Sequence, residues 1–452
     1  MVKKLFIILF LSLGCLISGC ESFYRATKAQ YSSSKGQWGR VVPIADNNHP
    51  NLYYNQSEID ELRKMVLVQR TPALLWDLWK NRVSRMYAQG PSSSDNPANN
   101  NIGAALSYML EPTDRKADAI RSALLDFMKR FPNGGGRDNG GDCWWGAKNW
   151  FYSGYSVPWL YDLLMAYHPQ KLTASEIPAL KNWFHLTSGN CHKDNWSIYT
   201  PANDSAPLTE REGKTVAGYA NWWTRHLGNG FAAALMSGNQ DDVDYWFDSG
   251  WPHDKLFFDE SWTPARGQHQ FDMVMILLAV FPSGANEDTY LREGYRLPQS
   301  DWSTVCYTHG IYHFANMYGA ILAAEAAYHN GMTDVYKLTD AGEPALLRTY
   351  KRAIASRNEV DNSPHWSNDE GCKTYAPNPG QPIIGWDPII YLGYRRYADP
   401  MIENAILDIP NNGKFLAWPP NDAAPNDLSA EFSPFFGYPR HTVWSGRASP
   451  HY

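Results

Sequence analysis

The sequence of 452 residues has no excess of basic charge and few cysteines. Its 40 lysines and arginines are outnumbered by 46 aspartates and glutamates, for a formal net charge of -6. No basic stripe is present, which argues against a nucleic-acid ligand. Only four cysteines, Cys143, Cys191, Cys306 and Cys372, follow the first twenty residues. They are spaced too widely for a zinc cluster, and we expect neither a metal nor another cofactor.

Strand signals and nucleotide-binding motifs are equally scarce. The sequence has no β-α-β alternation, no glycine-rich phosphate loop and no nucleophile-elbow motif. These absences argue against a parallel α/β fold and against the α/β-hydrolase type of catalytic site. Beyond the N-terminus, no unbroken apolar run reaches the roughly 20 residues that a membrane-spanning helix needs. We therefore expect a water-soluble body with mainly helical structure.

The N-terminus has the pattern of an export signal. A short cationic stretch ending at Lys4 precedes the apolar run Leu5 to Ile17, and Leu16 to Cys20 resembles the lipobox of bacterial lipoproteins. This predicts a signal peptide over residues 1–19, a lipid on Cys20 and a polar tether over residues 20–45. The expected location is the outer membrane, facing the periplasm or the cell surface. One or two disulfides could form there, and the sequence does not choose a pairing.

Aromatic residues are abundant. The chain has 19 tryptophans and 27 tyrosines, and aromatics make up 14% of it. Sugars present apolar C–H faces that stack on aromatic rings, and buried tryptophans need a partner for their N–H group. The composition therefore favours a protein that handles carbohydrate. A large aromatic core is the alternative that composition alone leaves open.

Apolar residues recur at helical spacing along most of the chain. Ser57 and the residues after it are expected to open a capped helix with Ile59, Leu62 and Val66 on its apolar face. Further helices are predicted over residues 116–130, 157–167, 174–184, 228–237, 273–280, 312–330 and 344–356. Polar loops are predicted between them over residues 132–142, 191–207, 283–287 and 358–382.

This succession of helices without a strict repeat predicts a mainly α fold. We expect helical hairpins arranged as an incomplete (α/α) toroid, a barrel of hairpins that forms a single catalytic domain over residues 46–452. The stretch from about Asn411 is rich in proline and is expected to wrap the surface of that domain. We expect the protein to be a monomer.

The first of three informative blocks begins at Asn149 and Trp150 and runs through a glycine and a proline into a leucine-rich helix. It resembles the segment of family 8 polysaccharide lyases in which Asn-Trp-Trp precedes such a helix and a Leu-Thr-x-x-Glu-Ile sequence. In that family the aromatic residues stack on the polymer. The resemblance implies substrate binding by Asn149 and Trp150, and internal packing of these aromatics is the alternative.

The second block, Gly218 to His226, contains Asn221, Trp222 and Trp223. It is similar to the Gly-Ala-Asn segment of the family 8 lyases and to the Asn-Asn-His segment of the family 5 alginate lyases. In both families this asparagine binds the uronate carboxylate, which implies the same role for Asn221 and substrate binding by the two tryptophans. A helix N-cap is the alternative role for Asn221.

The third block, Phe258 to Phe271, resembles the Asp-Gly-Ser-Phe-x-Gln-His stretch that carries the catalytic histidine of the family 8 lyases. Strict spacing places Ala265 at the histidine position, and His269 lies four residues later. Arg266 matches the arginine in the arginine-rich helix of the alginate lyases. The tyrosine that both families carry farther along is missing here. His269 is therefore a candidate base, and a structural histidine is the alternative.

A substitute tyrosine is available downstream, where Tyr307, His309 and Tyr312 cluster at the start of a predicted helix. Tyr307 or Tyr312 could transfer a proton, and His309 and Tyr312 could bind substrate. His309 and His313 also have the spacing of metal ligands, but no carboxylate motif accompanies them.

The resemblance covers residues 140–275 and implies β-elimination of a 4-linked uronate polymer such as alginate or glucuronan. In this mechanism Asn221, helped by Arg266 or His269, neutralises the carboxylate. A histidine or tyrosinate removes the C5 proton, and a tyrosine protonates the departing O4. The absence of C-terminal β-sandwich domains makes the chain more similar in size to the family 38 lyases.

Two other functions remain open. A glycoside hydrolase on the same toroid would need two carboxylates across a cleft, and Asp259, Glu260, Asp369 and Glu370 are available. A non-catalytic glycan-binding lipoprotein would also fit the aromatics and the lipid anchor. The sequence does not identify the polymer, endo or exo action, or syn or anti geometry.

Overall fold

The computed structural model describes residues 40–71, 73–84, 98–135, 155–199, 227–247, 319–339, 342–351, 354 and 387–408. In this part of the chain 74% of the residues are helical and none lies in a strand, which confirms a mainly α protein. None of the helices described there is both long enough and apolar enough to cross a bilayer. The predicted C-terminal wrap, the helix over 273–280 and the loops over 283–287 and 358–382 lie outside these residues.

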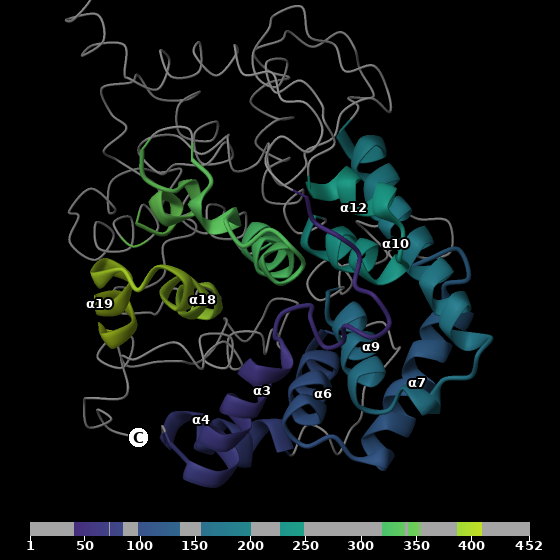
Figure 1. The fold of residues 1–452 in the computed structure, drawn as a ribbon, viewed down its shortest axis with the longest axis horizontal. Helices are drawn as coiled ribbons and strands as arrows, with labels where there is room; N and C mark the ends of the chain where they lie inside the picture. The colour runs from purple at the N-terminus through teal and green to yellow at the C-terminus, as the bar shows by residue number, and fades with distance from the viewer. Residues whose placement is uncertain are drawn as a thin grey trace, which may run out of the picture.

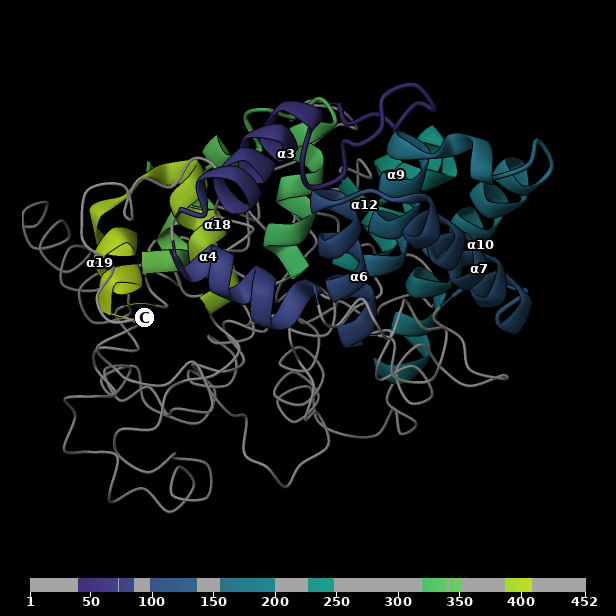
Figure 2. The same ribbon diagram turned by 90° about the horizontal axis from the view of Figure 1, so that it is seen from below.

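Figures 1 and 2 show the arrangement of the helices from two directions, with α18 and α19 at one end and α7 and α10 at the other. The labelled helices are α3 (Gln56–Arg63), α4 (Ala73–Leu78), α6 (Ala98–Leu110), α7 (Asp114–Arg130), α9 (Ser156–Tyr167), α10 (Glu176–Tyr199), α12 (Gln240–Phe247), α18 (Asp387–Tyr397) and α19 (Pro400–Asp408). Three further stretches are helical: 227–237, 319–329 and 345–351. Short π-helical turns (Lys64–Gln69 and Trp79–Val83) follow α3 and α4, and 3-10 turns occupy Pro169–Lys171 and Val335–Lys337.

Several helices follow the predicted ranges closely. The prediction over 116–130 falls within α7, which Thr113 caps through a 3.4 Å bond from the Lys116 amide to its hydroxyl oxygen. Asp114 in the first turn and Arg130 in the last suit the helix dipole. The prediction over 157–167 lies within α9, and the helices at 227–237, 319–329 and 345–351 confirm the described parts of three others.

Two predictions of helix and loop boundaries were wrong. The first helix is capped by Asn55, not Ser57: the Asn55 side chain accepts from the Glu58 amide, and the Glu58 carboxylate accepts from the Asn55 amide. Helix α10 continues to Tyr199, through the first nine residues of the loop predicted from Cys191. No glycine or proline interrupts residues 190–199, so the backbone can stay helical although few apolar residues mark its face.

The packed part of the domain begins earlier than residue 46. Val41 and Ile44 are 1% and 2% exposed, within the range predicted as a tether. The Val42 amide donates to the carbonyl of Asn330 (3.0 Å), and the Ile44 amide donates to that of Leu235 (2.9 Å). These bonds satisfy two backbone amides and fasten the segment to the ends of two helices.

The same segment continues toward α9. The carboxylate of Asp162, which is 1% exposed, accepts from the amides of Asn51 (3.1 Å) and Leu52 (3.0 Å), and its other contact is the imidazole of His49 (2.6 Å). One buried carboxylate thereby satisfies three polar groups that would otherwise be costly to bury. We call residues 41–52 the N-terminal strap.

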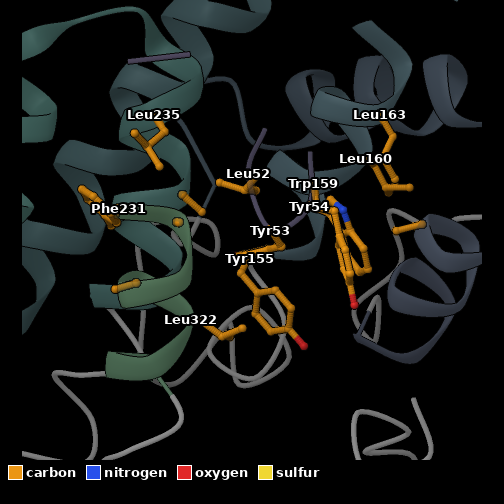
Figure 3. Packing of buried hydrophobic residues seen from close by; sticks show 14 of the residues in the cluster. Leu52, Tyr53, Tyr54, Tyr155, Trp159, Leu160, Leu163, Phe231, Leu235 and Leu322 are labelled. Carbon is orange, nitrogen blue, oxygen red and sulfur yellow. The ribbon is translucent and has the colours of Figure 1, made fainter. Parts of the chain in front are cut away.

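Tryptophans and tyrosines fill the core in the described part of the chain. Trp159 of α9 packs against Tyr53 edge-on at 5.8 Å between ring centroids, and it stacks on Tyr54 at 6.4 Å (Figure 3). Trp183 and Trp246 are each 1% exposed, and their indole N–H groups donate to the Phe131 carbonyl and to the Ser188 hydroxyl, respectively. In these residues the aromatic surplus therefore serves the core, the alternative that composition left open.

One helix contact requires a glycine. A Cβ atom at Gly230 would lie 2.2 Å from Cζ2 of Trp246, whose indole N–H is held by the Ser188 hydroxyl of α10 at 2.8 Å. We predict that Gly230→Ala lowers the free energy of unfolding by about 1–3 kcal/mol through overpacking. Urea denaturation measures this change.

Gly189→Ala is the matched control, because Gly189 also lies in a helix but a Cβ atom added there would have no neighbour within 4 Å. Alanine favours helix over glycine, so this variant should gain up to about 1 kcal/mol. Equal stabilities for the two variants would contradict the close contact between Gly230 and Trp246.

Candidate functional site

None of the residues predicted for a lyase site lies among the described residues. This holds for Asn149, Trp150, Asn221, Trp222, Trp223, Arg266, His269, Tyr307, His309 and Tyr312, and for the lipidation candidate Cys20. It holds as well for the four carboxylates that a hydrolase could use. Their roles stay predictions, and the geometry below concerns the other polar groups of the fold.

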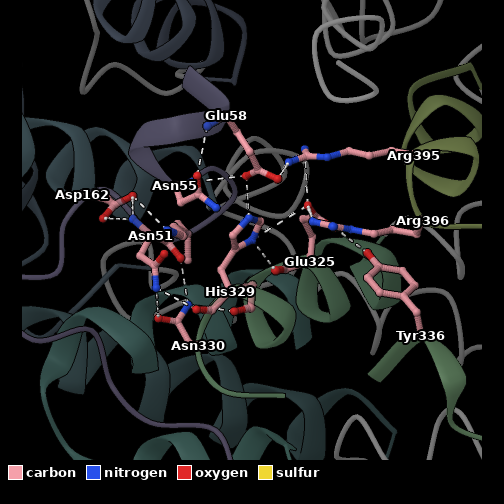
Figure 4. A network of polar contacts seen from close by, with 12 residues as sticks. Asn51, Asn55, Glu58, Asp162, Glu325, His329, Asn330, Tyr336, Arg395 and Arg396 are labelled. Atoms are coloured by element: carbon pink, nitrogen blue, oxygen red, sulfur yellow. Dashed lines mark hydrogen bonds and ion pairs between the residues drawn. The ribbon is translucent and has the colours of Figure 1, made fainter. Parts of the chain in front are cut away.

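The most concentrated polar group in the described part is a buried set of five ionisable side chains, here called the charged cluster (Figure 4). Its members are Glu58 of α3, Glu325 and His329 of the helix at 319–329, and Arg395 and Arg396 of α18. Their side chains are between 0% and 7% exposed. Charges are rarely buried so completely unless they are paired with one another.

Glu325 is paired with side chains of two other elements. Arg396 donates from Nε to Oε2 at 2.8 Å and from Nη2 to Oε1, a fork that matches the planar guanidinium to the carboxylate. Tyr336 donates its hydroxyl to Oε2 at 2.7 Å, and Nη1 of Arg395 lies 3.4 Å from Oε1. Each of these three partners comes from an element other than the helix that carries Glu325.

Glu58 connects the cluster to the start of α3. Its Oε2 accepts from the Asn55 amide at 3.1 Å as part of the capping box and lies 2.8 Å from Nε2 of His329. Its Oε1 is paired with Nη2 of Arg395. The capping carboxylate of α3 therefore also anchors that helix to the helix at 319–329 and to α18.

The electrostatic balance keeps the carboxylates ionised. Burial alone would raise the pKa of Glu325, but the guanidiniums of Arg395 and Arg396 outweigh it and lower the pKa to about 2. The pKa of Glu58 is also lowered, since the hydrogen bond with His329 and the charge of Arg395 outweigh its burial. Burial raises the pKa of Tyr54 and of Tyr336 well above the ordinary range, which keeps both phenols neutral.

This arrangement is suited to holding helices together and not to proton transfer. A general acid or base works best with a pKa near the working pH, whereas both carboxylates here stay ionised and are enclosed by cations. Structural ion-pair networks also perturb pKa values, so the shifts alone do not indicate catalysis. We conclude that the charged cluster is a structural centre of the fold.

A second polar group consists of a tyrosine hydroxyl, a histidine imidazole and an aspartate carboxylate that contact one another in that order. The Tyr108 hydroxyl lies 2.6 Å from Nδ1 of His168, and Nε2 of His168 lies 3.7 Å from a carboxylate oxygen of Asp114. Burial raises the pKa of Tyr108 above the ordinary range, so its phenol stays protonated at neutral pH. A buried phenol held in this state ties α6 to the residue that follows α9 and does not act as a base.

Metal-binding geometry is not found in this part of the molecule: no three histidine, cysteine, aspartate or glutamate side chains gather there as metal ligands. His309 and His313 lie outside the described residues, so the role of their spacing stays a prediction. The prediction that the protein needs no cofactor likewise stays a prediction.

Sequence reasoning missed the charged cluster, although a signal for it exists. Glu325 is the only charged residue within the otherwise apolar stretch 319–327, and Arg395 and Arg396 follow a run of apolar residues in α18. A lone charge in an apolar helix indicates a buried and paired group. The pattern does not reveal which partners pair, because Glu58 and His329 are 271 positions apart.

Comparison of the chain with protein-family models, with curated proteins and with solved structures finds no match.

The cluster predicts a large effect of neutralising Glu325. Glu325→Gln leaves two buried guanidiniums without this carboxylate, and removing one partner of a buried pair costs about 3–5 kcal/mol. Urea denaturation of the variant should show a loss of this size. The control is Asp334→Asn, which removes an exposed pair with Lys337 at 2.7 Å and should change stability by less than about 1 kcal/mol.

The lowered pKa of Glu325 also predicts an acid dependence. Its carboxylate stabilises the fold fully above the ordinary value of 4.5, and this contribution is lost as the pH falls toward about 2. The free energy of unfolding of the wild type should therefore fall between about pH 5 and pH 2 more steeply than that of Glu325→Gln. Parallel pH profiles for the two proteins would contradict the pairing.

Proposed function

We propose that this chain is a polysaccharide lyase that cleaves a 4-linked uronic-acid polymer, such as alginate or glucuronan, by β-elimination. The observation that carries the proposal is the block from Gly218 to His226, which is similar to the carboxylate-binding segment of two lyase families. The blocks around Trp150 and His269 precede and follow it in the order found in the family 8 lyases.

The chemistry requires such a residue. Removing the C5 proton of a uronate places negative charge on the carboxyl group, and preorganised amide donors stabilise that charge as it develops. In the proposal Asn221 supplies these donors, helped by Arg266 or His269. Asparagine fits the role because its amide donates without carrying a charge that would need its own partner.

The remaining roles follow from the elimination. His269 or a tyrosinate removes the C5 proton, the C4–C5 double bond forms, and the C4–O4 bond breaks. Tyr307 then protonates the departing O4, which becomes the new chain end. Asn149, Trp150, Trp222, Trp223, His309 and Tyr312 are proposed to bind the sugar rings on either side.

The described helices support the toroid part of the proposal. A ring of helical hairpins brings early and late helices together, and the pairing of Glu58 with Arg395 joins α3 to α18. The contacts of the N-terminal strap with Leu235 and Asn330 add links to the ends of the helices at 227–237 and 319–329. We therefore propose an incomplete (α/α) toroid, to which the mainly α content adds support.

The first prediction from this proposal concerns the product. Incubation with alginate, glucuronan or hyaluronan should generate the ultraviolet absorbance of an unsaturated uronate. New reducing ends without absorbance would instead identify the toroid glycoside hydrolase. Binding without either product would identify a glycan-binding lipoprotein, and each of these outcomes would overturn the lyase proposal.

Asn221→Ala tests the assignment of the carboxylate site. Loss of one preorganised donor should lower kcat by about 100-fold to 1,000-fold, with the fold retained. Asn404→Ala is the control, since Asn404 is exposed on α19 and should leave the rate unchanged. Full activity in Asn221→Ala would remove Asn221 from the mechanism.

We also propose that the protein is an outer-membrane lipoprotein anchored through Cys20 and otherwise free of the bilayer, which would place it where polysaccharides arrive. Cys20→Ser should abolish labelling by radioactive palmitate in cells and shift the protein out of the membrane fraction. Cys15→Ser, a change within the apolar run of the signal, should leave both properties intact. Labelling that persists in Cys20→Ser would exclude this anchor.

A further inference from the structure

Imidazole is the side-chain type that ordinarily changes charge near neutral pH. The charged cluster contains one imidazole among its described members, that of His329. It faces Glu58 from α3 and Glu325 from its own helix, and both carboxylates have a lowered pKa. The nearby cations of α18, Arg395 and Arg396, have a raised pKa and stay charged.

The two phenols around the cluster do not change charge in this range either. Tyr54 precedes α3, and its ring lies 4.9 Å from the guanidinium carbon of Arg395; Tyr336 donates to Glu325. Both have a pKa raised by burial. The ring of Tyr328 packs edge-on against the imidazole at 5.4 Å between centroids.

The hydrogen bonds of His329 require a proton on both ring nitrogens. Nδ1 lies 2.9 Å from the backbone carbonyl oxygen of Glu325, which can only accept. Nε2 lies 2.8 Å from Oε2 of Glu58. The carboxylate of Glu58 is ionised, so it has no proton to donate and can only accept. Both nitrogens of an imidazolium donate, whereas a neutral imidazole has one donor and one acceptor.

A neutral ring would therefore place two lone pairs against each other. If Nδ1 kept its proton, the bare Nε2 would face the carboxylate of Glu58 at hydrogen-bond distance. The other tautomer would turn a bare Nδ1 toward the carbonyl of Glu325. Either arrangement loses one hydrogen bond in a place where the ring is only 2% exposed and water cannot readily replace it.

We propose that His329 is a pH-sensitive latch that fastens α3 as an imidazolium and loosens it when the ring loses its proton. This device is independent of the proposed catalytic function. The latch holds the helix start where Glu58 and Asn55 form the capping box. It also lies beside the N-terminal strap, because the Asn51 side chain donates to the carbonyl of His329 at 2.7 Å.

Loosening is expected to be local. The side of α3 that carries Ile59 and Leu62 remains buried in the core, and Glu58 keeps its pairing with Arg395. Helix α7, by contrast, has its own cap at Thr113 and contributes no member to the charged cluster. The proposal therefore predicts a change confined to α3 and the strap, with α7 as an internal reference.

Amide hydrogen exchange of the full chain at about pH 6 to 9 tests this. After correction for intrinsic exchange rates, the protection of α3 relative to α7 should fall about 10-fold to 100-fold as the pH rises, the equivalent of one hydrogen bond between charged groups. Constant relative protection of α3 across this range would overturn the proposal.

Two variants test whether the pH dependence of α3 protection comes from the contact between His329 and Glu58. Glu58→Gln keeps a residue suited to the capping box. Its side-chain amide can donate to the bare Nε2 of a neutral imidazole, so the relative protection of α3 should no longer fall with pH. His329→Gln removes the imidazole and should also flatten the profile. A fall with pH in Glu58→Gln equal to that of the wild type would contradict the latch, and this test holds even if His329→Gln does not fold.

His185→Gln is the matched control. His185 contacts the carboxylate of Asp242 at 2.8 Å, but its side chain is 47% exposed and lies on α10, away from the cluster contacts. The pH profile of α3 in this variant should equal that of the wild type. A flattened profile in His185→Gln would show that the pH dependence of α3 comes from His185, and this would overturn the role of His329.

Discussion

The fold depends on a buried set of charges whose members compensate one another. Ionised groups lose their hydration on burial, and paired partners must compensate for that loss. Glu325 receives a guanidinium fork and a phenol, while Glu58 is paired with an imidazole and a guanidinium. These partners come from the first, middle and last described regions of the chain. The cluster therefore joins segments that no local interaction could hold together.

Aromatic packing has a complementary role in the described residues. The core around Trp159 connects α9 to the residues before α3, and the N-terminal strap connects the same region to helices far along the chain. Apolar burial supplies most of the stabilisation of such a domain, while the polar contacts select which helices meet. The aromatic richness that pointed to sugars is thus partly explained by packing, so the lyase proposal depends on its sequence blocks, above all the one around Asn221.

Local patterns predicted part of this fold and could not have predicted the rest. Helices α7 and α9 were found because their apolar spacing and flanking residues are distinct. Helix α6 was missed because residues 101–110 are all buried, so no polar face marks its period. The cluster escaped prediction since its partners are distant in sequence, 71 positions apart for Glu325 and Arg396 and 271 for Glu58 and His329, and a single sequence carries no pairing signal over such distances. The residues predicted for the catalytic site lie outside the described structure, and their geometry stays a prediction.

The central claim is that buried charge pairing joins α3 to α18, two helices that are distant in sequence. A double-mutant cycle measures this directly, with Glu58→Gln, Arg395→Met and the combined variant compared by urea denaturation. Residues in one buried network should be coupled, and we predict an interaction energy of about 1.5 kcal/mol or more. Additive effects, with a coupling within about 0.5 kcal/mol of zero, would contradict the account.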